Sequence, residues 1–339
     1  MKPMPFKFTF KGHQRKSPAE LVAVDIGNTG LKVVKVRKSK DGLVVEAADI
    51  LPSFPELTPD TRLALPKNLM ANYTALMISG ESAVVRILNL PSQDIEQMDM
   101  EQLREHVGLG EDFRVGHAVV APQRGKAEAK VLVVGIPEQQ AESVLSLVPY
   151  GPPAPFSIEV AGLAALTAFL RGPGTKHAQE AVAVIESGAK VTFMALFNKN
   201  VLSLVRKFDF GSETFVARVQ QQLGVDRETA MGVVADGSFD ISQIAHEVMD
   251  PFLRQFSISR DFVERREDSR VADVYLSGGA SLSRYWLEEI QGAVGINVHV
   301  WNPFENLRLA PDAYPANLEG QQTRFTAAVG ACLGVFQET

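Results

Sequence analysis

The sequence predicts an α/β protein with two related lobes, because a strand–turn–strand pattern occurs twice along the chain. In the first copy, residues 21–36, an apolar strand ends at Asp25 and is followed by a glycine-containing turn and a second alternating strand. Residues 181–197 repeat this order, and aligning the copies pairs Asp25 with Glu186 at an offset of 161 residues (186 − 25). Since the chain has 339 residues, this offset is close to half its length and indicates two related halves around one cleft.

Hydrophobic and turn patterns predict the remaining elements in order. Between the two hairpins we expect strand character over 75–90 and 130–135, helices over 94–106, 138–147 and 158–170, and irregular connections over 51–68 and 150–155. After the second hairpin we expect helices over 212–223, 227–235, 242–266, 283–291 and 324–336, and strands over 271–276 and 298–301. Strands and helices mixed in this way are typical of an α/β fold.

The composition is that of an ordinary globular protein and excludes several classes of function. The 34 Lys and Arg residues against 40 Asp and Glu residues give a net charge of -6, without the basic footprint of a nucleic-acid-binding protein. The single cysteine, Cys332, excludes an internal disulfide and a multi-cysteine metal site. The six histidines show no i, i+4 pair, so we expect no histidine metal site. No apolar run reaches the ~20 residues of a membrane helix, and we expect a cytoplasmic protein.

The first 18 residues form a basic leader in which Phe6, Phe8 and Phe10 alternate with polar residues. This period-two pattern is typical of a strand. The leader could add as a strand to a partner or touch an anionic membrane surface. The alternative is a frayed terminus, which is the more common state of a terminal segment.

A strand that ends in a carboxylate and runs into a glycine-containing turn is suited to phosphate binding. Backbone N–H groups of such a turn can surround phosphate oxygens, because glycine permits close approach. The neighbouring carboxylate can hold Mg²⁺, usually through water. Two such hairpins facing each other would grip a polyphosphate from both sides, and a third turn at Gly278-Gly279 could lie against the flat face of a base.

These motifs resemble those of the actin-like ATPase superfamily and, more specifically, the PilM family of type IV pilus assembly proteins, which is related to the cell-division protein FtsA. The two phosphate motifs and the adenosine motif are matched by residues 25–32 (DIGNTGLK), 186–188 (ESG) and 276–280 (LSGGA). Further similarities lie at 84–91, 157–164, 302–304 and 325–334. The resemblance implies an actin-like (ribonuclease H-like) two-lobed α/β fold, with duplicated ββ-hairpin phosphate motifs and a small inserted α+β domain.

The resemblance also implies a domain organisation. It comprises a basic leader arm at 1–18, a first actin-like lobe made of 19–78, 151–180 and 325–339, an inserted small domain at 79–150, and a second actin-like lobe at 181–324. The first lobe is discontinuous because the last helix is expected to return to it.

Carried over residue by residue, the resemblance implies ATP and Mg²⁺ as cofactors. Asp25 and Glu186 would hold the metal. Glu159, which matches an acid of the family's first connecting helix, would act with Glu186 as a catalytic residue by positioning the metal or an attacking water. The nucleotide would be bound by Gly27, Asn28, Thr29, Lys32, Gly188, Thr192, Gly278 and Gly279. Phosphoryl hydrolysis in such a site depends on positioning and electrostatics rather than on a covalent nucleophile.

Two departures from the family pattern predict slow or absent hydrolysis. Glu186-Ser187-Gly188 stands where the family usually has Asp-Ile-Gly, and the longer acid moves its carboxylate farther from the backbone. Lys190 stands among positions that are usually small and hydroxylated, where it could neutralise phosphate charge or pair with Glu186. We therefore expect ATP binding with slow or absent ATPase activity.

The resemblance implies a scaffold of a type IV pilus or related secretion assembly, cytoplasmic and associated peripherally with the inner membrane through partners. The partner would be the cytoplasmic N-terminal tail of an inner-membrane protein, PilN, and self-association is also compatible with the family. Two alternatives stay open, a filament-forming protein like FtsA and a small-molecule kinase of the actin superfamily. The sequence ends directly after its closing helix, without the amphipathic membrane helix usual in FtsA, and offers no convincing acceptor-side Asp base. Both observations favour the scaffold.

Overall fold

The computed structural model describes residues 17–91, 100–122, 128–237 and 239–336, which divide into two compact units. The first unit holds the described residues up to Gly172, together with Pro303–Glu319 and those from Phe325 onward. The second holds Pro173–Asn302 and Gly320–Arg324. Nearly all of the basic leader, with its three phenylalanines, lies outside the described residues, as does the first part of the acidic segment expected to be helical over 94–106.

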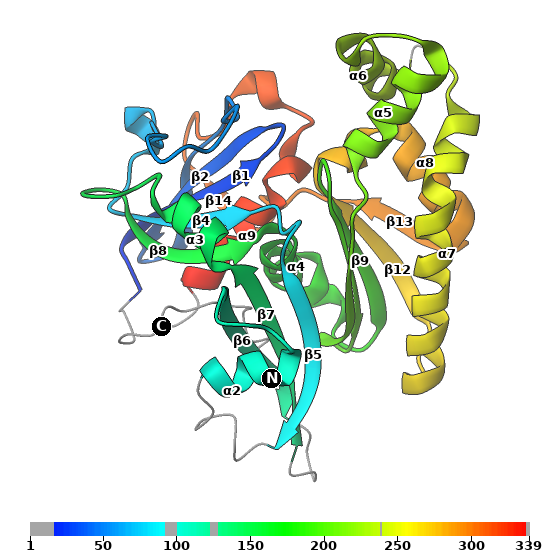
Figure 1. The fold of residues 1–339 in the computed structure, drawn as a ribbon, viewed down its shortest axis with the longest axis horizontal. Coiled ribbons are helices and arrows are strands. Elements are labelled where there is room, and N and C mark those ends of the chain that lie inside the picture. Colours follow the sequence, from blue (N-terminus) through cyan, green and yellow to red (C-terminus); the bar gives the residue numbers. More distant parts are fainter. Residues whose placement is uncertain (1–16, 92–99, 123–127, 238, 337–339) are drawn as a thin grey trace. The chain divides into compact units, whose positions relative to one another are not determined.

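The first unit is built on a six-stranded sheet in the order β14-β3-β2-β1-β4-β8 (Figure 1). The strands are β1 (Glu20–Gly27), β2 (Gly30–Ser39), β3 (Gly42–Leu51), β4 (Tyr73–Ile78), β8 (Ala154–Val160) and β14 (Arg308–Leu309). Helices α4 (Ala161–Arg171) and α9 (Thr326–Val335) pack against each other, and α9 also contacts β1, β2 and β4. Both helices are buried along nearly their whole length, so they form the core of this unit rather than its surface.

The first unit also contains a three-stranded antiparallel sheet in the order β5-β7-β6. Its strands are β5 (Val84–Pro91), β6 (Phe113–Pro122) and β7 (Glu128–Pro137), accompanied by helices α2 (Met100–Val107) and α3 (Glu138–Leu145). Leu103 of α2 packs with Leu90, Val131 and Val133 in a small buried cluster. The sheet therefore has an apolar core of its own. Two short 3₁₀ helices, η1 (Lys67–Leu69) and η4 (Ala316–Leu318), complete the unit.

The second unit has a five-stranded sheet in the order β11-β10-β9-β12-β13 (Figure 1). The strands are β9 (Ala181–Ser187), β10 (Thr192–Asn198), β11 (Val201–Phe208), β12 (Val271–Ser277) and β13 (Asn297–Val300). The helices are α5 (Ser212–Leu223), α6 (Arg227–Asp236), α7 (Ser242–Glu267) and α8 (Arg284–Val294), with short 3₁₀ turns η2 (Pro173–His177), η3 (Gly279–Leu282) and η5 (Gln322–Phe325). In the described part of the chain, no helix is both long and apolar enough to cross a membrane.

Both large sheets contain the same five-strand arrangement. The series β3-β2-β1-β4-β8 and β11-β10-β9-β12-β13 each consist of two antiparallel pairings followed by two parallel ones. Asp25 lies opposite Lys32 in the first hairpin, and Glu186 lies opposite Phe193 in the second. The 161-residue offset thus holds on both strands (186 − 25 and 193 − 32), and the predicted duplication of the hairpins is confirmed.

Some predicted elements differ from those in the structure. The helix expected over 158–170 begins only at Ala161, because the preceding residues belong to β8, which pairs in parallel with β4. The β-branched Ile158 and Val160 fit this extended, buried strand, and Val160 leads directly into the helical Ala/Leu run. The connection expected over 150–155 ends before Ala154, where β8 begins.

Strands β3, β6 and β11 have no counterpart among the predicted elements. For β11 a signal was available in the turn before it. Lys199 and Asn200 have φ values of 53° and 60°, which is the backbone of a two-residue hairpin turn, and asparagine is favoured there.

The half-buried His117 of β6 is expected to make stability depend on pH. Burial lowers the pKa of His117 below its ordinary 6.5, so the folded chain holds the imidazole uncharged while the unfolded chain protonates it. Stability attributable to this group is then present above about pH 6.5 and falls as the pH drops below it. The urea concentration at the unfolding midpoint should fall between about pH 7 and pH 5, and we expect it to fall less steeply in His117→Gln than in the parent. The matched change at the exposed His106 should leave the slope as in the parent, and an unchanged slope in His117→Gln would contradict the prediction.

Candidate functional site

The first hairpin places a carboxylate and an ammonium group close together. Lys32 on β2 lies opposite Asp25 on β1, with the Lys32 Nζ 3.8 Å from the Asp25 Oδ2. The Lys32 Nζ also donates to the Thr29 Oγ1 at 3.4 Å. Asp25 and Lys32 are only 8% and 7% exposed. Because a buried charge is costly unless it is paired, these two groups stabilise each other at the end of the hairpin.

The turn of this hairpin leaves space for the Lys32 side chain against its backbone. A Cβ built on Gly27 would lie 2.6 Å from the Lys32 Nζ, so glycine provides the room that the ammonium occupies. Asn28 and Thr29 are exposed at the tip, and Gly30 has a φ of +112° that closes the turn. The predicted phosphate-binding residues of the first half therefore gather around one short turn.

Glu159 belongs to the same row of the sheet, although it lies on a strand and not on the helix where it was predicted. Across the sheet, Asp25 of β1 pairs with Met77 of β4, and Met77 pairs with Glu159 of β8. Paired residues point to the same face, so Lys32, Asp25 and Glu159 share one face. Strands β1, β4 and β8 are parallel and reach the row near their carboxyl ends, which is where α/β sheets usually bind ligands.

The Glu159 carboxylate is held in a polar contact within the core. The Ser157 Oγ donates to the Glu159 Oε1 at 3.0 Å, and both residues are almost fully buried. Ser157 and Glu159 are two positions apart, so on a strand both point the same way. Burial, together with the charge of Glu159, raises the pKa of the Cys332 thiol above its ordinary value. Cys332 is therefore an inert core residue, as expected for a buried thiol.

The second hairpin differs from the first in the residue that lies opposite its acid. The position that corresponds to Lys32 is Phe193, which is 1% exposed. Thr192 lies opposite Ser187 and is fully buried, and its Oγ1 donates to the Phe210 carbonyl at 2.8 Å. Lys190 is exposed at the turn. The two hairpins thus share a backbone register but differ in chemistry.

The second turn is tied to the start of α5 by its backbone. The Gly188 N–H donates to the Val191 carbonyl at 2.9 Å. The carbonyls of Gly188 and Ala189 accept from the N–H groups of Ser212 and Glu213 at 3.1 and 2.8 Å. These bonds satisfy N–H groups that a helix start otherwise leaves without partners, and they fix the shape of the turn.

The third predicted motif packs directly against the second. Ser277 pairs with Glu186 across β12 and β9, and Gly278 follows with a φ of +86°. A Cβ on Gly278 would lie 2.3 Å from the Ser187 carbonyl oxygen and 2.7 Å from the Glu186 Oε1. The Gly278 N–H donates to the Thr323 carbonyl at 3.2 Å. Within the second unit, the structure therefore brings the Glu186 turn and the predicted adenosine motif together.

Gly278 and Gly279 offer a matched pair of substitutions. Gly278→Ala combines a left-handed φ with a backbone clash, and we expect it to lower the free energy of unfolding by about 2–3 kcal/mol. Gly279 has open space around its Cα, with nothing within 4 Å of a built Cβ. Gly279→Ala should therefore leave the urea midpoint unchanged. Equal stability of the two variants in chemical denaturation would contradict the packing described for Gly278.

Comparison with known proteins identifies the family. A family model described as type IV pilus assembly protein PilM matches residues 156–336. This chain belongs to the PilM family. The matched segment includes Glu159 and all predicted site residues of the second unit, whereas the first hairpin precedes it. Among curated proteins the comparison found no match.

Solved structures agree with this assignment at the level of the fold. A structure described as the PilM-PilN type IV pilus biogenesis complex matches with a TM-score of 0.77 and 20% identity, over 94% of this chain and 99% of that one. The archaeal actin homologue Ta0583 matches at a TM-score of 0.46 and 12% identity, over 94% of this chain and 100% of that one. MreB 5 of Spiroplasma citri bound to AMPPNP matches at a TM-score of 0.45 and 9% identity, over 94% of this chain and 95% of that one. The TM-score of 0.77 to the PilM-PilN structure confirms the predicted α/β fold.

Two residues of this PilM-family chain contact predicted site residues but were not themselves predicted. Ser157 contacts Glu159, and Thr323 contacts Gly278 through its backbone. The i, i+2 spacing of Ser157 and Glu159 would have indicated the first contact had β8 been recognised as a strand. The second joins residues 45 positions apart (323 − 278), and no local sequence pattern reports such a contact.

Proposed function

We propose that this PilM-family protein is a nucleotide-binding, actin-like scaffold of a type IV pilus or related secretion assembly. Nucleotide binding is supported above all by the row of Lys32, Asp25 and Glu159 on one face of the first sheet. A cation, a metal-binding carboxylate and a second acid in one row are the groups that a magnesium–nucleotide site requires. Both acids lie near the carboxyl ends of the parallel strands β1 and β8.

In this proposal each residue of the first hairpin has a distinct role. The Lys32 ammonium would turn from Asp25 toward phosphate oxygens, and the turn at Gly27, Asn28 and Thr29 would donate backbone N–H groups. Asp25 would hold Mg²⁺, which offsets phosphate charge when it is bound. Glu159 would orient a water or the metal's hydration shell. The donor set fits, because the space beside Gly27 already accommodates a charged group.

The motifs of the second unit keep the roles that the family resemblance implies. Glu186 and the turn at Gly188 would face the phosphates, and the backbone at Gly278 and Gly279 would contact the adenosine. Thr192 would act through its hydrogen bond to Phe210 by fixing the turn. Because Glu186 stands where the family usually has an aspartate and Lys190 lies in the same turn, we propose slow or absent hydrolysis, with the nucleotide acting as a switch or a structural ligand.

The partner in this proposal is the cytoplasmic N-terminal tail of a PilN-like inner-membrane protein. This rests on family membership and on the fold shared with the PilM-PilN complex over nearly the whole of both chains. The protein would then lie in the cytoplasm and reach the inner membrane through that tail.

Peptide binding tests the partner proposal. N-terminal peptides of inner-membrane proteins encoded beside pilus or secretion genes are labelled and titrated with the full chain, and fluorescence anisotropy is recorded. We expect saturable binding of one peptide and none of its scrambled version. If no peptide binds and a small-molecule phosphoryl acceptor is turned over instead, the scaffold proposal is wrong and the kinase alternative holds.

A further inference from the structure

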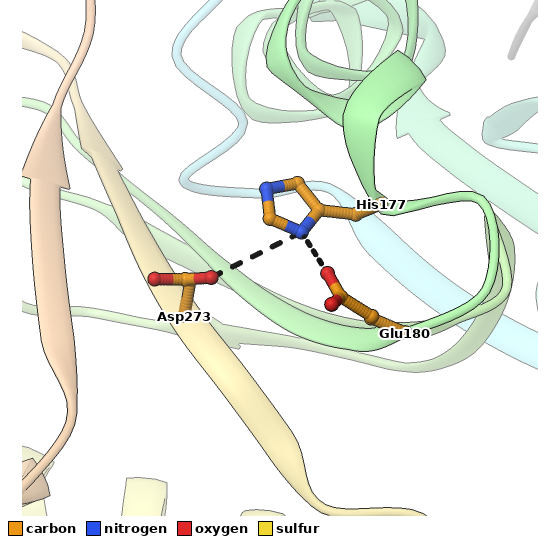
Figure 2. A group of neighbouring side chains, drawn as sticks. All are labelled: His177, Glu180 and Asp273. Carbon is orange, nitrogen blue, oxygen red and sulfur yellow. Dashed lines mark hydrogen bonds and ion pairs between the residues drawn. The ribbon is translucent and has the colours of Figure 1, made fainter.

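The second unit contains a group of metal-ligating side chains that no predicted motif includes. They are His177 at the end of η2, Glu180 just before β9, and Asp273 on β12. Figure 2 shows one carboxylate oxygen of Glu180 and one of Asp273 directed at the Nδ1 of His177. These three atoms all lie within 4.8 Å of one another. The sequence alone indicated no histidine metal site, because the ligands come from segments almost 100 positions apart.

The local fold explains why these side chains meet. The Glu180 N–H donates to the His177 carbonyl at 3.1 Å, which closes a turn and brings both side chains to one side. On β12 the register with β9 shifts between Val271 and Asp273. Such an irregularity re-aims the side chains beside it and is common next to functional sites. Asp273 is thereby directed toward the turn.

The distances suit a small divalent ion. The His177 Nδ1 lies 2.6 Å from the Glu180 Oε2 and 3.9 Å from the Asp273 Oδ2. Ligand atoms about 2.0–2.1 Å from a tetrahedral zinc ion are separated by about 3.3 Å. The observed distances lie on either side of this value, so side-chain rotations alone would complete the geometry.

The groups behind the ligands are arranged to orient them. The His177 Nε2 lies 2.6 Å from the Tyr275 hydroxyl, so an N–H there can donate to that oxygen and leave the Nδ1 lone pair for a metal. The His299 Nε2 lies 2.8 Å from the Asp273 Oδ1, which leaves Oδ2 facing His177. Tyr275 and His299 are paired in register across β12 and β13. Two of the three ligands thus have a partner on the side away from the proposed ion, and partners of this type are usual in metal sites.

The exposure of the three ligands allows an ion to enter. The side chains of His177 and Asp273 are 10% and 16% exposed, whereas that of Glu180 is 52% exposed. Two mostly buried ligands and one half-exposed carboxylate at the surface leave a further coordination position for water. The mixture of one imidazole and two carboxylates suits zinc better than Mg²⁺, which prefers oxygen ligands only.

We propose that His177, Glu180 and Asp273 bind a zinc-class divalent ion that fastens the start of the second unit to its sheet. The chain enters this unit at Pro173, and the ion would tie that first segment to β12. The proposal is independent of the nucleotide site, because Glu180 and Glu186 lie at opposite ends of β9, about 20 Å apart.

The test is equilibrium dialysis of the tag-free full chain against Zn²⁺, followed by elemental analysis of the bound metal. A parallel dialysis uses Mg²⁺ at the same concentration. We expect one zinc ion per chain, a rise in Tm with zinc, and no competition by Mg²⁺. Glu180→Gln and Asp273→Asn should each weaken zinc binding at least about tenfold. Glu180 is half-exposed, so Glu180→Gln should fold normally. The test therefore stays decisive even if Asp273→Asn fails to fold.

His246 and Glu289 provide the matched control. They form a histidine–carboxylate pair at 3.1 Å outside the group of three. Glu289→Gln should leave the zinc stoichiometry and affinity as in the parent. Absence of bound zinc, binding that is equal in Glu180→Gln and the parent, or equal affinity for Mg²⁺ would each overturn the proposal.

Discussion

Replacing Gly330 with alanine is expected to destabilise the first unit by more than about 3 kcal/mol. A Cβ at this position would lie 1.8 Å from the Ala164 carbonyl oxygen and 2.5 Å from its carbon. These are backbone atoms of a buried helix, so they cannot rotate away, and α4 and α9 would have to separate. Interiors packed at this density transmit such a shift to the sheet beneath. The measurement is urea unfolding of the variant and the parent.

Gly334 supplies the control on the same helix. It is also buried, but nothing lies within 4 Å of a built Cβ. Because alanine is a better helix former than glycine, Gly334→Ala should be neutral or stabilising by up to about 1 kcal/mol. If Gly330→Ala were no less stable than Gly334→Ala, the close approach of α4 and α9 at Ala164 would be wrong.

Replacing Lys32 with methionine is expected to lower the affinity for Mg-ATP at least about tenfold. A charged hydrogen bond to phosphate contributes about 1.5–3 kcal/mol, and about 1.4 kcal/mol corresponds to a factor of ten in affinity. Methionine keeps the length and apolar stem of the side chain but removes the ammonium beside Asp25 and Gly27. The measurement is titration with a fluorescent ATP analogue, competed by unlabelled ATP.

Lys35 is the matched control for this prediction. It lies on the same strand and contacts the carboxylates of Glu20 and Glu46 at 3.4 and 3.2 Å, away from the turn. Lys35→Met makes the same change in charge and should bind nucleotide like the parent. Equal affinity of Lys32→Met and the parent would remove Lys32 from the proposed site.

The sequence predicted the parts of this fold that depend on local pattern. The apolar strands ending at Asp25 and Glu186 and their common offset led to the duplicated hairpins, because strand alternation and turn chemistry are local signals. The same offset pairs Lys32 with Phe193, so this difference between the hairpins can be read from the sequence, although no expectation was based on it. What this lysine contacts, and the space left for it by Gly27, required the folded turn.

Non-local contacts account for what the sequence did not predict. Glu159 was assigned to a helix because the following Ala/Leu run is helical, whereas pairing of β8 with β4 makes it a strand residue. The same pairing puts it in one row with Asp25. His177 and Asp273 look unrelated in sequence, and only the parallel pairing of β9 with β12 brings them together.

Calorimetric titration of the purified full chain with Mg-ATP tests nucleotide binding by this PilM-family protein most directly. We expect saturable binding to one site, complete below millimolar nucleotide and weakened in Lys32→Met, with little phosphate released over the course of the titration. No heat of binding at millimolar Mg-ATP, from protein whose unfolding transition shows it to be folded, would contradict a nucleotide site at the first hairpin.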